Sequence, residues 1–265
     1  YHHEYPPLGL LYLAAYAREK GHEVGFFDEG AARKDPADTV HRRMSEFRPE
    51  AYCLSLYTTN LLNAYWLIKL IRMERPGATV IVGGPHATSL PERTLRECPE
   101  IDFLVIGEGE EVLAELLGAL EEGQPAGHIP VICFRDPEGE IRSNPRNPFI
   151  RDLDSIPFPA YDLQSGLQNS QDPVRKGKQA GSIVTSRGCP FDCTFCNKAV
   201  FGSTYRRRSP ENVVREIRYQ QDVLGADEIY FMDDLFAANR RWLEDFYAIL
   251  DREGIRMPWK CLGRV

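Results

Sequence analysis

The chain has 265 residues, of which 43% are hydrophobic, and its formal net charge is −7. These values are typical of a soluble globular protein with one large or two ordinary domains. The acidic balance and the lack of a long basic run argue against nucleic-acid binding and against an anionic membrane surface, and no apolar run is long enough to span a bilayer. The chain opens at Tyr1 and closes inside an expected strand, so we expect a fragment of a longer protein.

The first half of the chain alternates helix and strand signals. Helices are expected at residues 8–20, 36–47, 61–75, 91–97 and from about 110 to 121, and strands at 23–28, 51–56, 79–82 and 101–106. Continuous apolar strands separated by helices indicate a parallel sheet that is covered on both faces. We therefore predict an α/β fold, with a Rossmann-like doubly wound sheet over residues 1–143 whose first strand is missing from the chain.

The second half begins with an expected hairpin at residues 131–142. Residues 144–180 are rich in Pro, Asp and Ser with weak periodicity, so we expect a linker there. Strands are then expected at 182–186, 228–232 and 259–265, with helices at 210–224 and 240–253. Ser209 and Pro210 form a favourable helix start. This series predicts that residues 181–265 are the first part of a β/α barrel, truncated at its C-terminal end.

Cysteine usage indicates the redox environment. The chain has seven cysteines. An odd number without any sign of secretion predicts a reducing, cytoplasmic environment and no disulfide framework. Cys53 and Cys133 lie in apolar runs, so we expect both to be buried.

Three other cysteines form a C-x3-C-x2-C motif, made of Cys189, Cys193 and Cys196, in a loop rich in Gly, Pro, Asp and Asn. Three thiolates on one loop can converge on a single metal centre, and soft thiolates favour zinc or an iron–sulfur cluster. Zinc needs a fourth ligand, but the last histidine, His128, lies well before the loop, and Cys261 is remote in sequence. The pattern therefore favours a four-iron cluster, with zinc as the alternative.

A cluster with three protein ligands leaves one iron open, which is a catalytic feature because a cofactor or substrate can bind there. The three cysteines, with Phe195 before the third, resemble the signature of the radical S-adenosylmethionine (SAM) superfamily. The resemblance implies a [4Fe-4S] cluster whose open iron chelates SAM, and a one-electron reductant such as flavodoxin or ferredoxin. Reductive cleavage of SAM would give a 5′-deoxyadenosyl radical. The resemblance also implies that Phe195 and Asn197 lie near the adenine.

The end of the second expected barrel strand carries Asp233 and Asp234. Both should face the same mouth as the cysteine loop, and one should point into the barrel because neighbouring strand residues point to opposite sides. In radical SAM proteins this position often carries a small residue and a Glu that hold the SAM amino group. Asp233 and Asp234 are therefore candidates for binding SAM, and a helix cap or a solvated turn is the alternative.

A basic cluster, Arg206–Arg208, precedes the helix expected at 210–224. An anionic substrate or the SAM carboxylate is one possible partner. We favour the other interpretation, that these side chains are solvated charges just before a helix.

The first domain should bind its ligand at the C-terminal edge of its strands. The loops there supply these candidates: Gly30, Thr58, Gly83, Gly84, His86, Gly107, Glu108 and Gly109. Glycines permit close approach of the backbone to a large flat ligand, and the lack of a G-x-G-x-x-G motif disfavours a nicotinamide dinucleotide. His86 follows a Gly-Gly-Pro turn and could approach such a ligand, but we favour a loop-capping or solvent-exposed role for it.

A Rossmann-like domain followed by a radical SAM barrel is similar to the cobalamin-binding radical SAM family over nearly the whole chain. Four motifs carry the resemblance: PLGL at 7–10, GGPH at 83–86, GEGE at 107–110 and RSPE at 208–211. The resemblance implies cobalamin as a further cofactor. It also implies methylation of an unactivated carbon or phosphorus centre in a small-molecule or peptide substrate, such as a porphyrin, hopanoid or antibiotic precursor.

One departure from the family pattern concerns the cobalt ligand. The chain lacks the Asp-x-His-x-x-Gly motif whose His ligates cobalt in many cobalamin domains, and this changes the expected axial ligation. Two alternatives stay open: a radical SAM cyclase or rearrangement enzyme whose first domain recognises substrate, and a zinc-stabilised α/β binding module.

Overall fold

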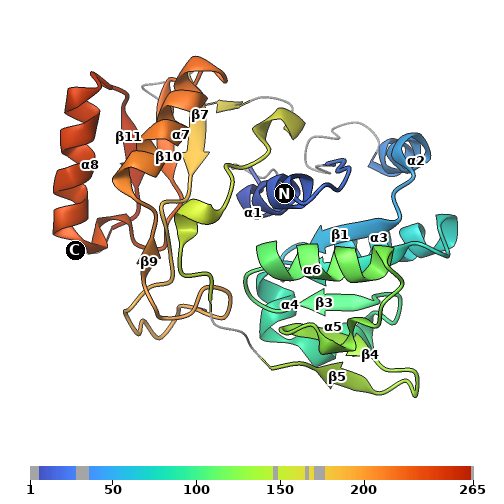
Figure 1. Ribbon diagram of the computed structural model, residues 1–265. Coiled ribbons are helices and arrows are strands. Elements are labelled where there is room, and N and C mark those ends of the chain that lie inside the picture. The colour runs from blue at the N-terminus through green and yellow to red at the C-terminus, as the bar shows by residue number, and fades with distance from the viewer. Residues whose placement is uncertain (1–5, 28–35, 146–148, 165–166, 170–176, 264–265) are drawn as a thin grey trace. The chain divides into compact units, whose positions relative to one another are not determined.

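The computed structural model describes residues 6–27, 36–145, 149–164, 167–169 and 177–263. The chain divides into two compact units (Figure 1). The five-stranded unit contains residues 16–149 and 199–201, and the four-stranded unit contains residues 1–15, 150–198 and 202–265. Helix α1 (Leu8–Glu19) contributes residues to both units. None of the helices in the described part of the chain has the length and apolar character to cross a membrane.

The five-stranded unit is built on one sheet of the described residues, in the order β1-β2-β3-β4-β5. Its strands are β1 (Ala51–Ser55), β2 (Thr79–Gly83), β3 (Phe103–Val105), β4 (Ile132–Arg135) and β5 (Ile141–Ser143). The pairs β1–β2 and β2–β3 are parallel, whereas β4 and β5 form the expected antiparallel hairpin and continue the sheet beyond β3. The helices of this unit are α2 (Pro36–Phe47), α3 (Leu61–Glu74), α4 (Pro85–Ser89), α5 (Pro91–Glu97) and α6 (Glu110–Glu121).

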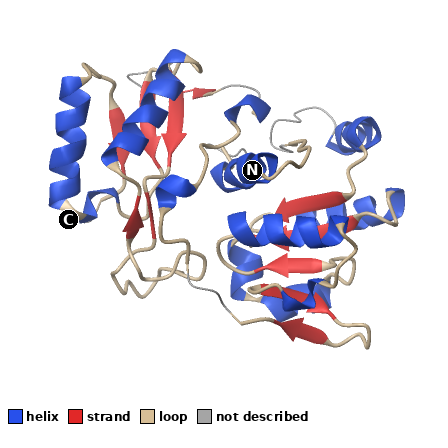
Figure 2. Ribbon diagram, in the orientation of Figure 1, coloured by secondary structure: helices blue, strands red, loops and turns tan. Residues whose placement is uncertain are grey.

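The core of this unit explains why its strands read as continuous apolar runs. Val80, Ile81 and Val82 of β2 are all at most 2% exposed, so both faces of this strand are covered. Helix α3 buries Ala64, Ile68 and Ile71, a spacing that keeps them on one face of a helix. The alternation of parallel strands with covering helices confirms the predicted α/β class (Figure 2).

Two expectations for this unit are wrong. Residues 22–27 form no strand, although we expected one at 23–28; position 28 lies outside the described residues. A strand exists only where it hydrogen-bonds to a neighbour, and no described strand pairs with these residues. Cys53 is exposed rather than buried, because β1 is an edge strand of the described sheet, whereas Cys133 is buried as expected.

The four-stranded unit carries the described sheet β11-β10-β7-β6. Strands β7 (Gln179–Ile183), β10 (Glu228–Phe231) and β11 (Trp259–Cys261) are parallel, and β6 (Gln168–Asn169) is antiparallel to β7. Helices α7 (Pro210–Asp222) and α8 (Arg240–Arg252) follow β7 and β10 along the chain, which confirms the expected β/α series. Ser209 caps α7 as expected, because its Oγ accepts a hydrogen bond of 3.1 Å from the backbone N–H of Asn212.

The first strand of this series ends earlier than expected. We expected residues 182–186, but β7 ends at Ile183, and a separate short strand β8 (Ser186–Arg187) pairs antiparallel with β9 (Arg206–Arg207). The chain therefore changes its pairing partner just before the cysteine motif.

Residues 150–163 lie within the bounds of the expected linker 144–180 but pack in the four-stranded unit. They include two short 3₁₀ helices, Leu153–Ser155 and Tyr161–Leu163. The side chains of Leu153, Ile156 and Tyr161 are buried in one cluster with Leu8 and Tyr12 of α1. The domain boundaries at 143 and 180 stay a prediction.

Candidate functional site

The cysteine motif lies in the loop between β8 and β9, beyond the C-terminal end of β7. All three thiols are free; Cys189 and Cys193 are partly buried and Cys196 is exposed. Backbone hydrogen bonds close the loop on itself, from Cys196 to Cys193 at 3.0 Å and from Cys189 to Gly202 at 3.4 Å. Across the loop, the ammonium of Lys198 donates to the backbone oxygen of Phe191 at 3.0 Å and to Asp192 Oδ1 at 2.5 Å.

The donor set of this loop fits an iron–sulfur cluster, because three free thiols on one segment are the ligands that such clusters use. Among the described residues, no three His, Cys, Asp or Glu side chains form a ready-made metal site. Phe195 is 91% exposed, and Asn197 is also exposed. The loop therefore presents its aromatic ring and its third thiol to the outside of the four-stranded unit.

Asp233 and Asp234 follow β10 and have opposite environments. The residue Asp233 is 1% exposed, whereas Asp234 is exposed. The Oδ1 atom of Asp233 accepts hydrogen bonds from the backbone N–H and the hydroxyl of Thr185, both at 2.9 Å. It also accepts from the hydroxyl of Ser186 at 2.6 Å and from the Ser186 backbone N–H.

The second oxygen of the same carboxylate accepts none of these hydrogen bonds. Oδ2 of Asp233 is buried and has no hydrogen-bond partner among the described residues. Burial raises the pKa of Asp233 above its ordinary value, although the hydrogen bonds from Ser186 and Thr185 act in the opposite direction. A buried acceptor without a donor is uncommon in folded proteins and calls for a partner from a bound ligand or water. Sequence reasoning missed Thr185 and Ser186, because nothing in their local pattern signals a contact with a residue far along the chain.

The basic cluster is not the solvated patch that we favoured. Arg206 and Arg208 are 8% and 5% exposed, and only Arg207 is on the surface. Arg208 forms an ion pair with Glu216, which is fully buried, and its Nε donates to Asn212 Oδ1 at 2.7 Å. The physical reason is that α7 places a buried carboxylate opposite Arg208, and a guanidinium paired in this way can leave water.

The other candidates lie at the C-terminal edge of the parallel strands in the five-stranded unit. Gly83 ends β2, and Gly84 has a φ of +93°. A Cβ atom on Gly84 would lie 2.7 Å from Ser55 Oγ and 3.0 Å from the backbone nitrogen of Leu56, so this turn needs glycine. The close approach lets Leu56 donate to Gly83 O at 2.8 Å and His86 donate to Leu56 O at 3.0 Å.

Thr58 and His86 are brought together by this turn. Oγ1 of Thr58 lies 2.9 Å from Nδ1 of His86. The residue His86 is 8% exposed, and its Nε2 is buried without a partner among the described residues. The imidazole is therefore oriented through Nδ1, while Nε2 keeps its hydrogen-bonding capacity for a ligand.

The third loop of this edge follows β3. Gly107 has a φ of +86°, and its N–H donates to Thr88 Oγ1 at 3.0 Å. Thr88 is 4% exposed and was missed by sequence reasoning, since its only signal is its position shortly after the GGPH motif. Glu108 is half-buried and Gly109 precedes α6, whereas Gly30 lies outside the described residues.

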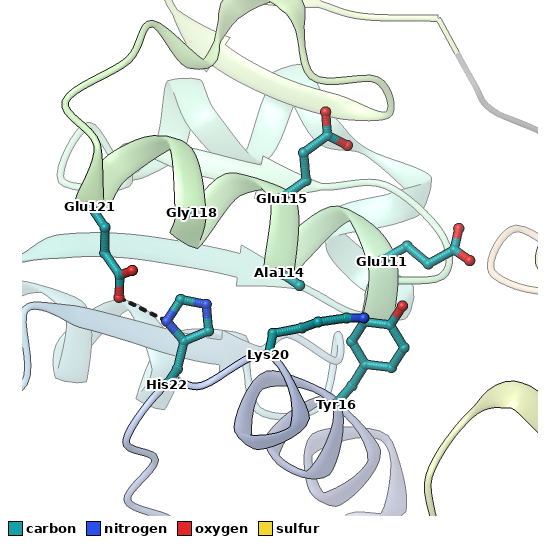
Figure 3. Close-up of a pocket in the computed structure, with 8 residues that line it drawn as sticks. All are labelled: Tyr16, Lys20, His22, Glu111, Ala114, Glu115, Gly118 and Glu121. Atoms are coloured by element: carbon teal, nitrogen blue, oxygen red, sulfur yellow. Dashed lines mark hydrogen bonds and ion pairs between the residues drawn. The ribbon is translucent and has the colours of Figure 1, made fainter.

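A surface groove of about 350 Å³ lies between the end of α1 and helix α6 (Figure 3). Its lining residues are Tyr16, Lys20, His22, Glu111, Ala114, Glu115, Gly118 and Glu121. Internal pairs satisfy several of them: His22 Nδ1 lies 2.8 Å from Glu121 Oε1, and the Lys20 ammonium lies 5.2 Å from the centre of the Tyr16 ring. None of the candidate site residues lines this groove.

Comparison with protein families agrees with both halves of the chain. The model of the B12 binding domain matches residues 1–117, and the model of the radical SAM superfamily matches residues 183–264. The fold and the cysteine loop thus define a radical SAM protein with a preceding cofactor-binding domain. The chain belongs to the family of radical SAM proteins that contain a cobalamin (vitamin B12)-binding domain.

Several curated relatives are similar to this chain along most of its length. An uncharacterized methyltransferase from Pyrococcus horikoshii is 36% identical over 261 residues, which is 98% of this chain and 55% of the relative. Cytidylyl-2-hydroxyethylphosphonate methyltransferase from Streptomyces wedmorensis is 29% identical over 96% of this chain and 55% of its own length. The anaerobic magnesium-protoporphyrin IX monomethyl ester cyclase of Rubrivivax gelatinosus is 29% identical over 98% of this chain and 47% of its own length. The chain thus spans about half the length of these relatives.

Solved structures show the same fold. The radical SAM methyltransferase TsrM from Kitasatospora setae, solved with cobalamin and a [4Fe-4S] cluster, has a TM-score of 0.74 at 20% identity. The match covers 94% of this chain and 48% of TsrM. OxsB, a cobalamin-dependent radical SAM enzyme, has a TM-score of 0.81 at 20% identity over 97% of this chain and 36% of its own length. The predicted order of a Rossmann-like domain and a radical SAM barrel segment is therefore confirmed.

Proposed function

We propose that this chain is the cofactor-bearing part of a cobalamin-dependent radical SAM enzyme of the methyltransferase type. The observation that carries the proposal is the loop of three free thiols beyond the C-terminal end of β7, next to a buried carboxylate with one free oxygen. In β/α barrels, this end of the strands is where reactive groups are placed. When bound, the cofactors supply one-electron cleavage of SAM at the cluster and a methyl group carried by cobalamin.

The three cysteines would hold the cluster as thiolates. Metal binding requires loss of the thiol protons, and it often completes the folding of a site whose ligands are not yet assembled. The free state of the three thiols and the exposure of Cys196 support this role, because the loop can admit iron and sulfide from outside. The same exposure suits delivery of one electron by a reductant such as flavodoxin or ferredoxin.

Residues around the loop would hold SAM. Oδ2 of Asp233 is suited to accept a hydrogen bond from the SAM ammonium, since it is the buried oxygen of this carboxylate without a donor. The exposed ring of Phe195 is available to pack against the adenine. Asn197 and Asp234 are further candidates for contacts with SAM.

The strand edge of the five-stranded unit would hold cobalamin. The buried Nε2 of His86 is the polar atom there that lacks a partner among the described residues. A ligand that supplies this partner would be favoured, because an unsatisfied buried polar atom costs about 1–3 kcal/mol. Thr58, Gly83, Gly84, Gly107, Glu108 and Gly109 complete the proposed contact set, together with Gly30.

The substrate is proposed to be a small molecule or a peptide, in a cytoplasmic setting and without nucleic acid. Methylation is the favoured reaction because several relatives are named methyltransferases. Cyclisation is the second candidate, and the observation in its favour is the similarity to the magnesium-protoporphyrin ester cyclases.

Anaerobic reconstitution of this chain with iron and sulfide tests the proposal. We expect a brown protein with about four irons per chain, as a single [4Fe-4S] cluster requires. The triple Cys189→Ala, Cys193→Ala and Cys196→Ala variant should take up none, and the Cys261→Ala variant serves as a control that keeps the full amount. A colourless protein that holds zinc would contradict the enzyme and support the binding module. Retention of cobalamin after anaerobic purification tests the five-stranded unit separately.

A further inference from the structure

Strand β10 makes its last regular contacts with β7 just before Asp233. The register pairs Phe231 with Ile183, and the Met232 N–H donates to Ile183 O at 2.8 Å. After Ile183 the chain leaves the ladder of β7. Thr185 and Ser186 are the second and third residues after Ile183. The Asp233 carboxylate replaces the backbone contacts that β7 no longer makes there, because its Oδ1 atom accepts hydrogen bonds from both residues.

These contacts lie directly ahead of the cysteine motif. Thr185 and Ser186 are 1% and 3% exposed, so their N–H groups have little access to water. Without the Asp233 carboxylate these donors would be buried and unsatisfied. This costs free energy, so we expect the segment to shift until the donors reach other acceptors. Cys189 follows Ser186 by three positions, so any movement of this segment displaces the first thiol of the motif.

We propose that Asp233 is a positioning residue for the cysteine loop, whose Oδ1 holds Thr185 and Ser186 so that the proposed cluster forms at a fixed distance from the end of β10. This inference rests on the proposed function. It assigns separate tasks to the two oxygens: Oδ1 anchors the loop, and Oδ2 stays available for a ligand. The hydroxyl groups of Thr185 and Ser186 donate to the same Oδ1 atom, so they are part of the contacts that anchor the loop. We call these contacts the anchor.

Three variants separate these tasks. Asp233→Ala removes the acceptor, whereas Asp233→Asn keeps a carbonyl oxygen that can take the place of Oδ1. The double variant Thr185→Val, Ser186→Ala removes the hydroxyl donors but leaves the backbone donors and nearly the same volume. The exposed Asp245 on α8 provides a matched control, Asp245→Asn.

The first measurement is amide hydrogen exchange at Thr185 and Ser186 in the reduced, cluster-free chain. A hydrogen bond to a charged acceptor is worth about 1.5–3 kcal/mol, so we expect exchange to be roughly ten- to a hundredfold faster in Asp233→Ala. Asp233→Asn should restore most of the protection and Asp245→Asn should change nothing. Equal exchange in the wild type and Asp233→Ala would overturn the proposal. This measurement does not require a cluster. It therefore tests whether Asp233 holds Thr185 and Ser186 even if the wild type binds no iron and the proposed function fails.

The second measurement is made on reconstituted protein. We expect Asp233→Ala to release iron to a chelator at least tenfold faster than the wild type and to show a changed electron paramagnetic resonance spectrum of the reduced cluster. Asp233→Asn should keep the wild-type spectrum. If Asp233→Ala does not fold, the double variant decides: faster release supports the anchor, and release at the wild-type rate overturns it.

Discussion

Thr58 Oγ1 and His86 Nδ1 lie 2.9 Å apart, and this contact joins the loop after β1 to the first turn of α4. The contact occupies one ring nitrogen of His86 and leaves the buried Nε2 as the atom without a partner. An imidazole that is oriented in this way presents a directed polar atom at the edge where α/β sheets bind ligands.

Replacement of His86 by Ala is expected to weaken cobalamin binding about tenfold, because one hydrogen bond of about 1–1.5 kcal/mol is lost. Thr58→Val should weaken binding less, since the imidazole remains but loses its orientation. An anaerobic absorbance titration with hydroxocobalamin measures both. The exposed His41 gives the control variant His41→Ala, which should bind like the wild type. If His86→Ala and the wild type bind hydroxocobalamin with equal affinity, His86 does not contribute to the cobalamin site.

Replacement of Gly84 by Ala should destabilise the five-stranded unit by about 1–3 kcal/mol, because a left-handed backbone and a Cβ contact of 2.7 Å both oppose the side chain. Gly118→Ala is the matched control: it lies within α6, and apart from the adjacent backbone of that helix no atom lies within 4 Å of its Cβ position. The control should raise stability by about 0.4–1 kcal/mol. Urea denaturation measures the two changes, and a destabilised Gly118→Ala with an unaffected Gly84→Ala would contradict the structure.

Replacement of Glu216 by Ala should destabilise the four-stranded unit by about 3–5 kcal/mol, since it leaves the buried Arg208 guanidinium without its charge partner. The exposed pair of Arg240 and Glu244 offers the comparison, because Glu244→Ala should cost less than about 1 kcal/mol. Denaturation followed by tryptophan fluorescence in a Trp66→Phe background, where the emission comes from Trp242 and Trp259 of this unit, distinguishes the two variants. Similar losses in both would show that the buried ion pair contributes little.

The cysteines should divide by reactivity at pH 8. Burial raises the pKa of Cys98 from 9.0 to about 12, so only a very small fraction is thiolate at pH 8 and alkylation is suppressed. The sign for stability follows: the neutral thiol is favoured in the folded state, so the free energy of unfolding falls as the pH rises from about 9 towards 12. Iodoacetamide labelling of the cluster-free chain, read by mass spectrometry, should modify Cys196 early and Cys98 only after unfolding. Early modification of native Cys98 would contradict its burial.

The sequence by itself determined those features that depend on residues close together in the chain. The C-x3-C-x2-C spacing places three thiols on one loop, Ser209 and Pro210 start α7, and the apolar run of β2 is that of a strand covered on both faces. These patterns are readable because helix caps, turns and strand alternation involve neighbours within a few positions.

Only the tertiary structure decided the features that depend on distant partners. Asp233 meets Thr185 across 48 positions, and Tyr161 receives a hydrogen bond of 2.7 Å from Gln220 across 59 positions. The expected strand is absent from residues 23–27 because strand formation needs a neighbour to pair with, which no local pattern reports. The solvated role favoured for Arg208 is wrong for the same kind of reason, since the buried Glu216 that pairs with it becomes its neighbour only after α7 has packed.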